Sequence, residues 1–255
     1  MITLYGPRAA PFTEKVIRGL ALKKLAFVLV EPESAEDYHR LNPETGLVPV
    51  MDIDGERIHD STAILLRLDA AFPEPPLLCD DPRTADNQLR LVRWVDEAFF
   101  WYWNRWMHRL TAGTLDGPPV AGESPTAAAS RATETELPRP AGVSLRSWVA
   151  SRVRKPPEPK KLGERERLVH ELGQRVVDLA RLLGPRPFFY ADRISIADLA
   201  VYAMLRSIAA DSIPDTSEHL RRLPALLEFM KRVERKTGGA SGPSPEPAHL
   251  APGAV

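Results

Sequence analysis

The first 75 or so residues alternate short apolar strands with helical segments in the order β-α-β-α-β-β-α. The expected strands cover 2–5, 26–31, 48–53 and 57–59, and the expected helices cover 11–25, 34–42 and 61–71. The dipeptide DG at 54–55, between the last two strands, is a hairpin turn signal. The first half therefore predicts a parallel βαβ unit, and the second half a hairpin followed by a helix.

The rest of the chain is predicted to be helical or irregular. A proline-rich stretch at 73–82 marks the change, so we expect one domain over 1–75, a linker over 76–83 and an all-α domain over 84–236. Helices are expected at 84–110, 144–154, 164–183 and 223–236, with another that begins near 194. The stretch at about 111–162 carries no apolar period and predicts a flexible insertion, and 237–255 predicts a disordered tail.

Composition excludes several classes of protein. The chain has 34 basic and 34 acidic residues, a balance that argues against a nucleic-acid-binding surface as its main role. A single cysteine, Cys79, allows no internal disulfide and fits a reducing compartment. The N-terminus does not resemble a signal peptide, and no apolar run reaches the roughly 18 residues of a membrane span. We expect a cytoplasmic protein with no transmembrane segment and no resident metal or cofactor.

A proline inside an expected strand is the first candidate site feature. Pro49 in GLVPVM (46–51) removes a ladder donor, which is rare within a sheet. The position makes sense if the Val48–Pro49 bond is cis, because the backbone of Val48 is then free to pair with an extended ligand. The segment order that leads to VPV and a DG hairpin is thioredoxin-like and favours this interpretation. The alternative is a proline on an edge strand.

The second candidate is the helix start in HDSTAILLRL, from residue 59. Asp60 and Ser61 precede an apolar helical run, and both types are favoured as N-caps, which is the simple interpretation. The functional interpretation is an anion site, since free N–H groups and the helix dipole favour a carboxylate and Ser61 adds a donor. Asp60 would take an ammonium group. Together they suit an amino-acid-like ligand end.

Two further motifs lie in the helical part. Ser195 and Asp198 in ISIADL resemble a capping box, and the motif predicts a purely structural role. Aromatic residues crowd the end of the helix expected at 84–110, on two of its faces, and most should serve packing. Tyr102 and Arg105 are the polar members that could face a ligand. The crowded aromatic residues are Trp94, Phe99, Phe100, Trp101, Tyr102, Trp103 and Trp106.

The segments LYGPRAAPFTEKV, LNPETGLVPVM, DGERIHDSTAILLRL and ISIADLAVYA together resemble the glutathione S-transferase superfamily, over about 1–82 and 163–236. The resemblance implies an α/β thioredoxin-like N-terminal domain, an all-α C-terminal helical domain and a homodimer. Glutathione would be the co-substrate, with its cysteinyl part on the Val48 backbone, beside Leu47 and Pro49, and its γ-glutamyl end on Asp60 and Ser61. A small hydrophobic co-substrate would lie between the domains, beside Tyr102, Arg105 and Trp106.

Two departures from the family pattern bear on activity. Where relatives carry a Ser, Cys or Tyr that acts on the glutathione sulfur, this chain has Pro7 and Ala10. The candidates left for a catalytic role are the hydroxyl of Tyr5 and the charge of Arg8, because a cation favours a thiolate. The second departure is Leu47, where relatives often carry a polar or basic residue.

These observations leave three hypotheses about function. The first is a glutathione transferase, an enzyme of detoxification, that conjugates glutathione to a hydrophobic electrophile through a non-standard thiolate site. The alternative is a non-catalytic binding or interaction protein, which a weaker likeness to the metaxin-like branch also suggests. A thiol–disulfide oxidoreductase is the third, but it needs a cysteine at a helix N-terminus and Cys79 is expected in the linker.

Overall fold

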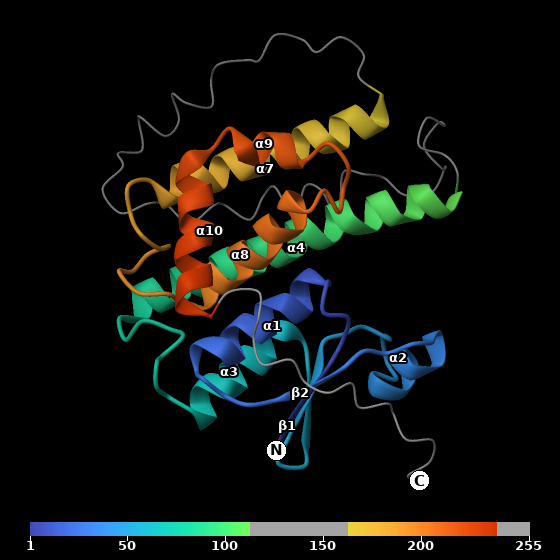
Figure 1. The fold of residues 1–255 in the computed structure, drawn as a ribbon, viewed down its shortest axis with the longest axis vertical. Coiled ribbons are helices and arrows are strands. Elements are labelled where there is room, and N and C mark those ends of the chain that lie inside the picture. Colours follow the sequence, from blue (N-terminus) through green and yellow to red (C-terminus); the bar gives the residue numbers. More distant parts are fainter. Residues whose placement is uncertain (113–162, 239–255) are drawn as a thin grey trace.

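The computed structural model describes residues 1–112 and 163–238, and for 107–112 it describes the helical backbone alone. The expected helix at 144–154, nearly all of the expected insertion and residues 239–255 lie outside the described residues. Figure 1 shows two layers, a small sheet with its helices below and a bundle of helices above.

Four short strands form one mixed sheet in the order β2-β1-β3-β4. The strands are β1 (Ile2–Tyr5), β2 (Val28–Val30), β3 (Val50–Ile53) and β4 (Glu56–His59). Strand β1 runs parallel to β2 and antiparallel to β3, and β3 and β4 form the expected hairpin. Strand β3 begins at Val50, two residues later than expected, directly after Pro49, whose nitrogen carries no hydrogen for a ladder bond.

Helices α1 (Pro11–Leu22) and α3 (Ser61–Ala71) cover one face of the sheet, while α2 (Ala35–Leu41) lies to one side (Figure 1). Alternate strand residues such as Leu4 and Met51 point into the core beneath the two helices. Gly19 allows α1 to lie close to α3, because a Cβ at this position would collide with a methyl group of Leu65. This close packing joins the last turn of α1 to the middle of α3.

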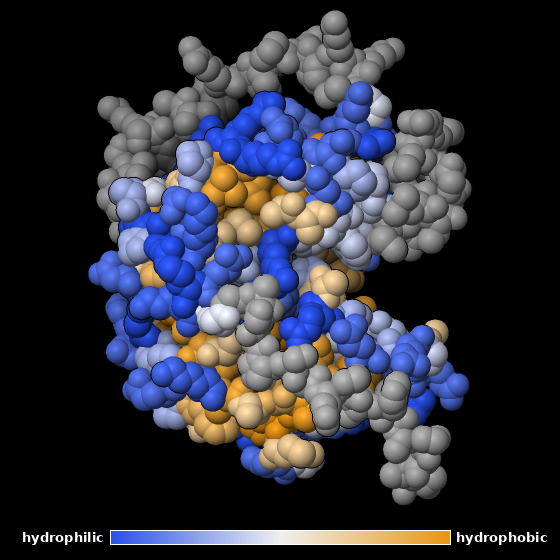
Figure 2. Space-filling view, viewed as in Figure 1, coloured by the Kyte–Doolittle hydropathy of each residue, from blue (hydrophilic) through white to orange (hydrophobic). Residues whose placement is uncertain are grey.

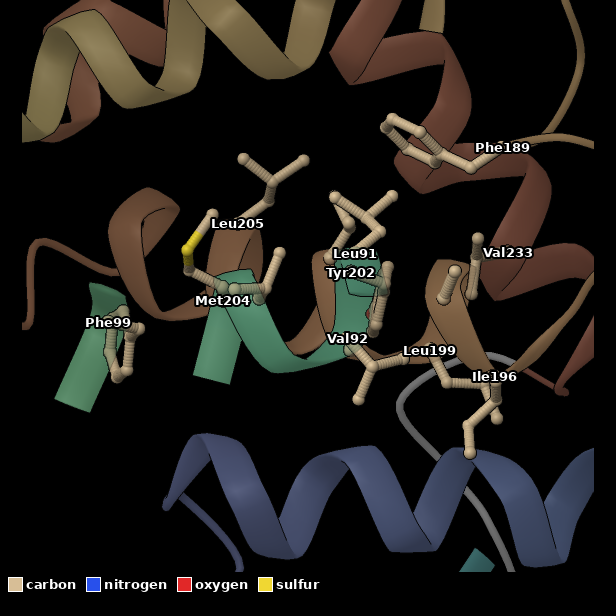
Figure 3. Close-up of a cluster of buried hydrophobic side chains, with 14 of the residues drawn as sticks. Leu91, Val92, Phe99, Phe189, Ile196, Leu199, Tyr202, Met204, Leu205 and Val233 are labelled. Carbon is tan, nitrogen blue, oxygen red and sulfur yellow. The ribbon is translucent and has the colours of Figure 1, made fainter. Parts of the chain in front are cut away.

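The helical part contains α4 (Pro82–Ala112), α7 (Glu164–Leu183), α8 (Ile196–Ala209), α9 (Ser217–Arg221) and α10 (Pro224–Lys236). Helix α8 lies at its centre, and all but two of its residues are buried. Figure 3 shows Tyr202, Met204 and Leu205 of α8 beside residues of α4, while Ile196 and Leu199 are directed towards α1. The core is therefore continuous from the sheet to the bundle through α1 and α8.

The connector between α3 and α4 is held from both sides. From the first domain, the ammonium of Lys23 donates to Asp69 at 2.7 Å and to the carbonyls of Phe72 and Pro75 at 2.6 and 2.9 Å. From the second, the guanidinium of Arg193 donates to the carbonyls of Pro76 and Leu78 at 2.6 and 2.8 Å. The proline-rich stretch is thus fixed to both parts of the molecule.

Several element boundaries differ from those predicted from the sequence. The second strand is confined to Val28–Val30, because only these residues pair with β1. Helix α4 begins at Pro82, where the side chain of Asp81 accepts from the Thr84 N–H at 2.8 Å, and it continues to Ala112. The helix α9 was not predicted, because its five residues are too few to show a helical period of apolar residues. The helices at 61–71 and 164–183 have the predicted bounds.

Candidate functional site

Residues 6–10, the opening turn, connect β1 to α1. The Gly6 N–H donates to the Val30 carbonyl at 3.0 Å, and the Ala10 N–H to the Pro7 carbonyl at 3.0 Å. Pro11 is the first residue of α1, and Ala10 before it makes no side-chain cap. The N–H groups of Phe12 and Thr13 have no carbonyl to bond within the helix. The start of α1 therefore has backbone N–H groups without a cap, and the positive end of the helix dipole lies there.

Two side chains of this region carry unused polar groups. Arg8, in the opening turn, is half-buried, and its guanidinium has no hydrogen-bond or ion-pair partner among the described residues. The hydroxyl of Thr13 is fully buried against Gly6 and is one of two buried side-chain polar groups in the described part of the chain without a partner. Arg8 thus keeps the position that the sequence suggested, while Thr13 was not singled out there.

Tyr5 does not fit the catalytic role suggested for it. Its hydroxyl donates to Asp52 at 3.1 Å, and the guanidinium of Arg57 lies 5.6 Å from the centre of its ring. Burial and the negative charge of Asp52 raise the pKa of Tyr5, while Arg57 lowers that of Asp52. Tyr5 alternates along β1 with the core residue Leu4, so it lies on the face of the sheet opposite α1. In this structure its single proton is donated to Asp52, away from the start of α1.

We expect Tyr5→Phe to leave the pKa of a bound thiol and any conjugation rate within about twofold of the wild type, because the hydroxyl serves Asp52. The cost in stability should be about 1 kcal/mol, the usual value for one hydrogen bond. Rate against pH and urea unfolding measure the two effects. A rate that falls tenfold or more at unchanged stability would return Tyr5 to the site.

The Val48–Pro49 peptide bond is cis, and the segment lies beside the opening turn. Tyr5 and Val50 are paired across β1 and β3, which brings the end of β1 next to the start of β3. Val48 lies outside the ladder, and neither its N–H nor its carbonyl bonds to a backbone group of the described residues. Its backbone therefore has the free donor and acceptor that pairing with an extended ligand requires. A second cis bond, Glu74–Pro75, was not expected from the sequence.

Asp60 and Ser61 lie at the next helix start, directly after His59, which pairs with Val50. Asp60 is the N-cap of α3, and its carboxylate accepts from the N–H groups of Thr62 and Ala63 at 2.9 Å each. The simple N-cap interpretation is therefore correct for Asp60, which keeps a second oxygen outside those two bonds. The Ser61 side chain is almost fully buried and accepts a hydrogen bond from the ammonium of Lys15 at 3.2 Å.

Lys15, which the sequence did not indicate, links three helices behind Ser61. Its ammonium group donates to Thr62 Oγ1 at 2.7 Å and to Asp96 Oδ2 of α4 at 2.6 Å, and only 1% of its side chain is exposed. Burial raises the pKa of Asp96, while the charge of Lys15 opposes that rise. Because Lys15 donates to Ser61, the serine hydroxyl proton is free to point away from it, towards a ligand.

The aromatic part of α4 is arranged differently from the expectation. Tyr102 and Trp106, proposed to line a co-substrate site, are 4% exposed and belong to the buried core. The guanidinium of Arg105 pairs with Glu164 of α7 and lies 5.3 Å from the centre of the Trp101 ring. The periodicity of α4 turns Tyr102 and Trp106 inward, so neither presents an open surface to a ligand, whereas 24% of the Arg105 side chain stays exposed.

Other aromatic residues of α4 contact the start of α1. The rings of Phe99 and Phe100 lie 6.4 and 6.3 Å from that of Phe12, both edge-on, and Trp103 stacks on Phe99 at 6.2 Å. Phe100 is one of three large hydrophobic residues exposed in the described part of the chain. Figure 2 shows the molecule hollowed on one side, between the layer of α4 and that of the sheet, where Figure 1 places the start of α1. An apolar wall therefore adjoins the opening turn.

The remaining predicted motifs lie away from this site. Asp198 accepts from the N–H groups of Ser195 and Phe189 at 2.8 Å each and from the Ser195 hydroxyl at 2.6 Å, which gives it the structural role expected. Cys79 lies half-buried in the connector, where its sulfur accepts from Gln88 at 3.2 Å. It is not at a helix N-terminus, as a thiol–disulfide oxidoreductase would need. Among the described residues no helix is both long and apolar enough to cross a membrane.

Solved structures of known proteins share this fold. The beta-etherase LigF from Sphingobium sp. strain SYK-6 superposes with a TM-score of 0.61 at 21% identity, over 91% of this chain and 94% of that one. A glutathione S-transferase from Methylobacterium radiotolerans in complex with glutathione sulfonate superposes with a TM-score of 0.58 at 22% identity, over 100% of this chain and 99% of that one. Identities this low show a common fold alone.

Sequence comparisons point the same way. Glutathione S-transferase U7 of Arabidopsis thaliana is 26% identical over 102 residues, which are 39% of this chain and 45% of that protein. The match thus spans less than half of that curated relative. Two family models also match, the glutathione S-transferase N-terminal domain over residues 4–76 and the C-terminal domain over residues 175–233. Both parts of the chain therefore carry the family pattern in the family order, and the chain belongs to the glutathione S-transferase superfamily.

Proposed function

We propose that this protein binds glutathione and conjugates it to a hydrophobic electrophile. The observation that carries the proposal is the convergence of three ligand-ready groups at one edge of the sheet. These are the unpaired backbone of Val48, the hydroxyl of Ser61 with Lys15 behind it, and the uncapped start of α1. The family model over residues 4–76 and the glutathione sulfonate bound by a structural neighbour support the same ligand.

Each group has a distinct part in binding. The Val48 backbone pairs with the cysteinyl N–H and carbonyl, while the buried Ser61 hydroxyl and the dipole of α3 hold the γ-glutamyl carboxylate. The second carboxylate oxygen of Asp60, which makes no bond to the helix, accepts from the ammonium group of the γ-glutamyl residue. A glutathione bound in this way would have its thiol over the opening turn, at the start of α1.

The chemistry then needs only a stabilised thiolate. The dipole of α1, the N–H groups of its first turn and the cation of Arg8 favour ionisation of the thiol, whose proton passes to solvent. The thiolate attacks an electrophilic carbon held against Phe12 and Phe100, a carbon–sulfur bond forms, and the leaving group departs with its electron pair. Ala10 supplies no hydroxyl, so backbone and charge replace the usual side chain.

The second candidate function is glutathione binding without turnover. Two observations favour it. No side chain of residues 6–10 carries a hydroxyl or a thiol, and the Tyr5 hydroxyl donates its hydrogen bond to Asp52. A homodimer and a cytoplasmic location remain part of the proposal for either function.

Calorimetric titration with glutathione tests the binding site. We expect Ser61→Ala to weaken binding about tenfold, the value of one hydrogen bond to a charged group. Ser217→Ala is the matched control, because Ser217 is also a buried serine at the first position of a helix and its hydroxyl donates to Asp211 at 2.7 Å, far from the site. Equal affinities for all three proteins, or no binding by the wild type, would refute the proposed site.

Turnover separates the two candidate functions. The wild type should conjugate an activated aryl halide, and Arg8→Gln should slow this reaction by roughly tenfold at neutral pH because the thiolate loses a nearby cation. Binding that survives with no conjugation of any aryl halide would instead select the non-catalytic function.

A further inference from the structure

The opening turn carries a positive charge that no described carboxylate neutralises. The Ala10 N–H donates to the Pro7 carbonyl at 3.0 Å, and this bond closes a β-turn with Arg8 and Ala9 at its corner. Arg8 is half-buried, and among the residues that the structure describes its guanidinium has neither a hydrogen-bond nor an ion-pair partner. Its N–H donors are therefore open to a ligand.

The acidic residues of the two helices next to this turn are paired with other cations. Glu14 of α1 accepts from Arg18 at 2.7 Å, and Asp96 of α4 accepts from Lys15 at 2.6 Å. Each of these carboxylates thus has its own basic partner within the fold. A bound ligand can supply the anion that Arg8 lacks.

The aromatic wall beside the turn favours a ring. Phe12 lies four residues after Arg8, and its ring meets those of Phe99 and Phe100 edge-on at 6.4 and 6.3 Å. The ring of Phe100 keeps 38% exposure, on the hollowed side of the molecule (Figure 2). Aromatic rings attract one another in edge-on and offset-stacked arrangements, so this wall can accept one further ring from a ligand.

We propose that the electrophile is an aromatic compound that carries a carboxylate, with its ring against Phe12 and Phe100 and its carboxylate on the guanidinium of Arg8. This inference rests on the proposed function and names the substrate class. Arg8 sets the specificity, because a guanidinium can hold a carboxylate through two parallel hydrogen bonds. The apolar wall alone would accept charged and neutral rings without this preference.

The carboxylate takes no part in the bond changes. The thiolate of glutathione attacks the ring carbon that bears a halogen, a carbon–sulfur bond forms, and the halide leaves with the electron pair of the carbon–halogen bond. The pair with Arg8 is the same before and during this step. It therefore acts on binding of the electrophile, and we expect it to lower KM more than it raises kcat.

Two activated aryl chlorides that differ only in charge test the inference, para-chloro-meta-nitrobenzoate and the corresponding benzamide. Each kcat/KM is divided by the rate of the same compound with free glutathione, which removes the difference in intrinsic reactivity. The wild type should then favour the benzoate by roughly tenfold, the value of one hydrogen bond between charged groups. Added salt should reduce this preference, because the pair is partly open to solvent.

Variants of Arg8 identify the group responsible. Arg8→Gln should bring the ratio of the two substrates near one, chiefly through a higher KM for the benzoate. Arg8→Lys should keep part of the preference, since it retains the charge but not the planar fork. Arg90→Gln is the matched control, because it removes the same charge from α4, where Arg90 is exposed and paired with Asp86 at 2.8 Å. Its ratio should equal that of the wild type.

The outcomes are separable. A wild type that uses both substrates with equal corrected efficiency, or whose preference does not respond to salt, overturns the inference and leaves the proposed function intact. Equal losses for both substrates in Arg8→Gln also overturn it, and would assign Arg8 to the thiolate alone. A wild type that binds glutathione but conjugates neither compound refutes the proposed conjugation and the inference together.

Discussion

Asp198→Ala is expected to lower the free energy of unfolding by about 3–5 kcal/mol, among the largest effects of any single substitution in this chain. The carboxylate is fully buried, and its removal leaves the N–H groups of Phe189 and Ser195 without a partner at the start of the central helix α8. Urea unfolding followed by circular dichroism measures the change. Ser195→Ala, which removes only the hydroxyl, should cost about 1 kcal/mol.

The same carboxylate gives the protein a pH dependence with a definite sign. Burial raises the pKa of Asp198 to about 7, against hydrogen bonds from Ser195 and Phe189 that favour the charged form. A raised folded-state pKa means that the native state binds the proton more tightly than the unfolded chain, whose value is about 4. The stability due to this proton is present below pH 4 and is lost as the pH rises to 7. Asp198→Asn should remove this loss, and an unchanged pH profile in that variant would contradict the assignment.

Lys15→Met should have the second large effect, a loss of about 3–5 kcal/mol, because it leaves the largely buried carboxylate of Asp96 without its cation. The double variant Lys15→Met/Asp96→Leu should regain most of this stability, since it removes both charges from the interior. The same urea titration reports each change. Single and double variants that are equally destabilised would show that the pair itself is not the cause.

Glutathione binding separates the two roles of Lys15. In the double variant stability returns, but Ser61 still lacks the donor that orients its hydroxyl, so affinity should remain several-fold below that of the wild type. Arg67→Met is a suitable control, because Arg67 is paired with Glu56 at 2.9 Å on the surface and exposed pairs contribute little. Full affinity in the double variant would make Lys15 a purely structural residue.

Local chemistry explains which parts of the molecule were predictable from the sequence. The helix over 61–71 was predicted with its observed bounds because Asp60 is a strong N-cap, and the Ser195–Asp198 box because its spacing fixes the geometry. Asp60 and Ser61 were proposed as ligand-binding residues from the same local signal. In sequence, a residue that only caps a helix cannot be told from one that also contacts a ligand. The position of Asp60 and Ser61 beside Val48 is the observation that supports a ligand-binding role.

Features that depend on distant residues were not predictable. Lys15 and Asp96 are separated by 81 residues, and in sequence Lys15 is an ordinary lysine on a helix. Tyr5 was proposed as catalytic from its proximity to the opening turn, whereas strand alternation and the partner Asp52 place it on the opposite face. Tyr102 and Trp106 were expected near a ligand, but which side of an aromatic helix is buried depends on where α7 and α8 pack.

The anchored connector has a consequence for how a ligand enters. Because Lys23 and Arg193 bind the carbonyls of residues 72–78 from opposite domains, the two domains have no free hinge along this segment. An anchored connector favours a fixed arrangement of the two domains, which would lower the conformational entropy that a ligand has to remove on binding. If glutathione binds as proposed, we expect it to enter a preformed hollow without a closing motion of the two domains.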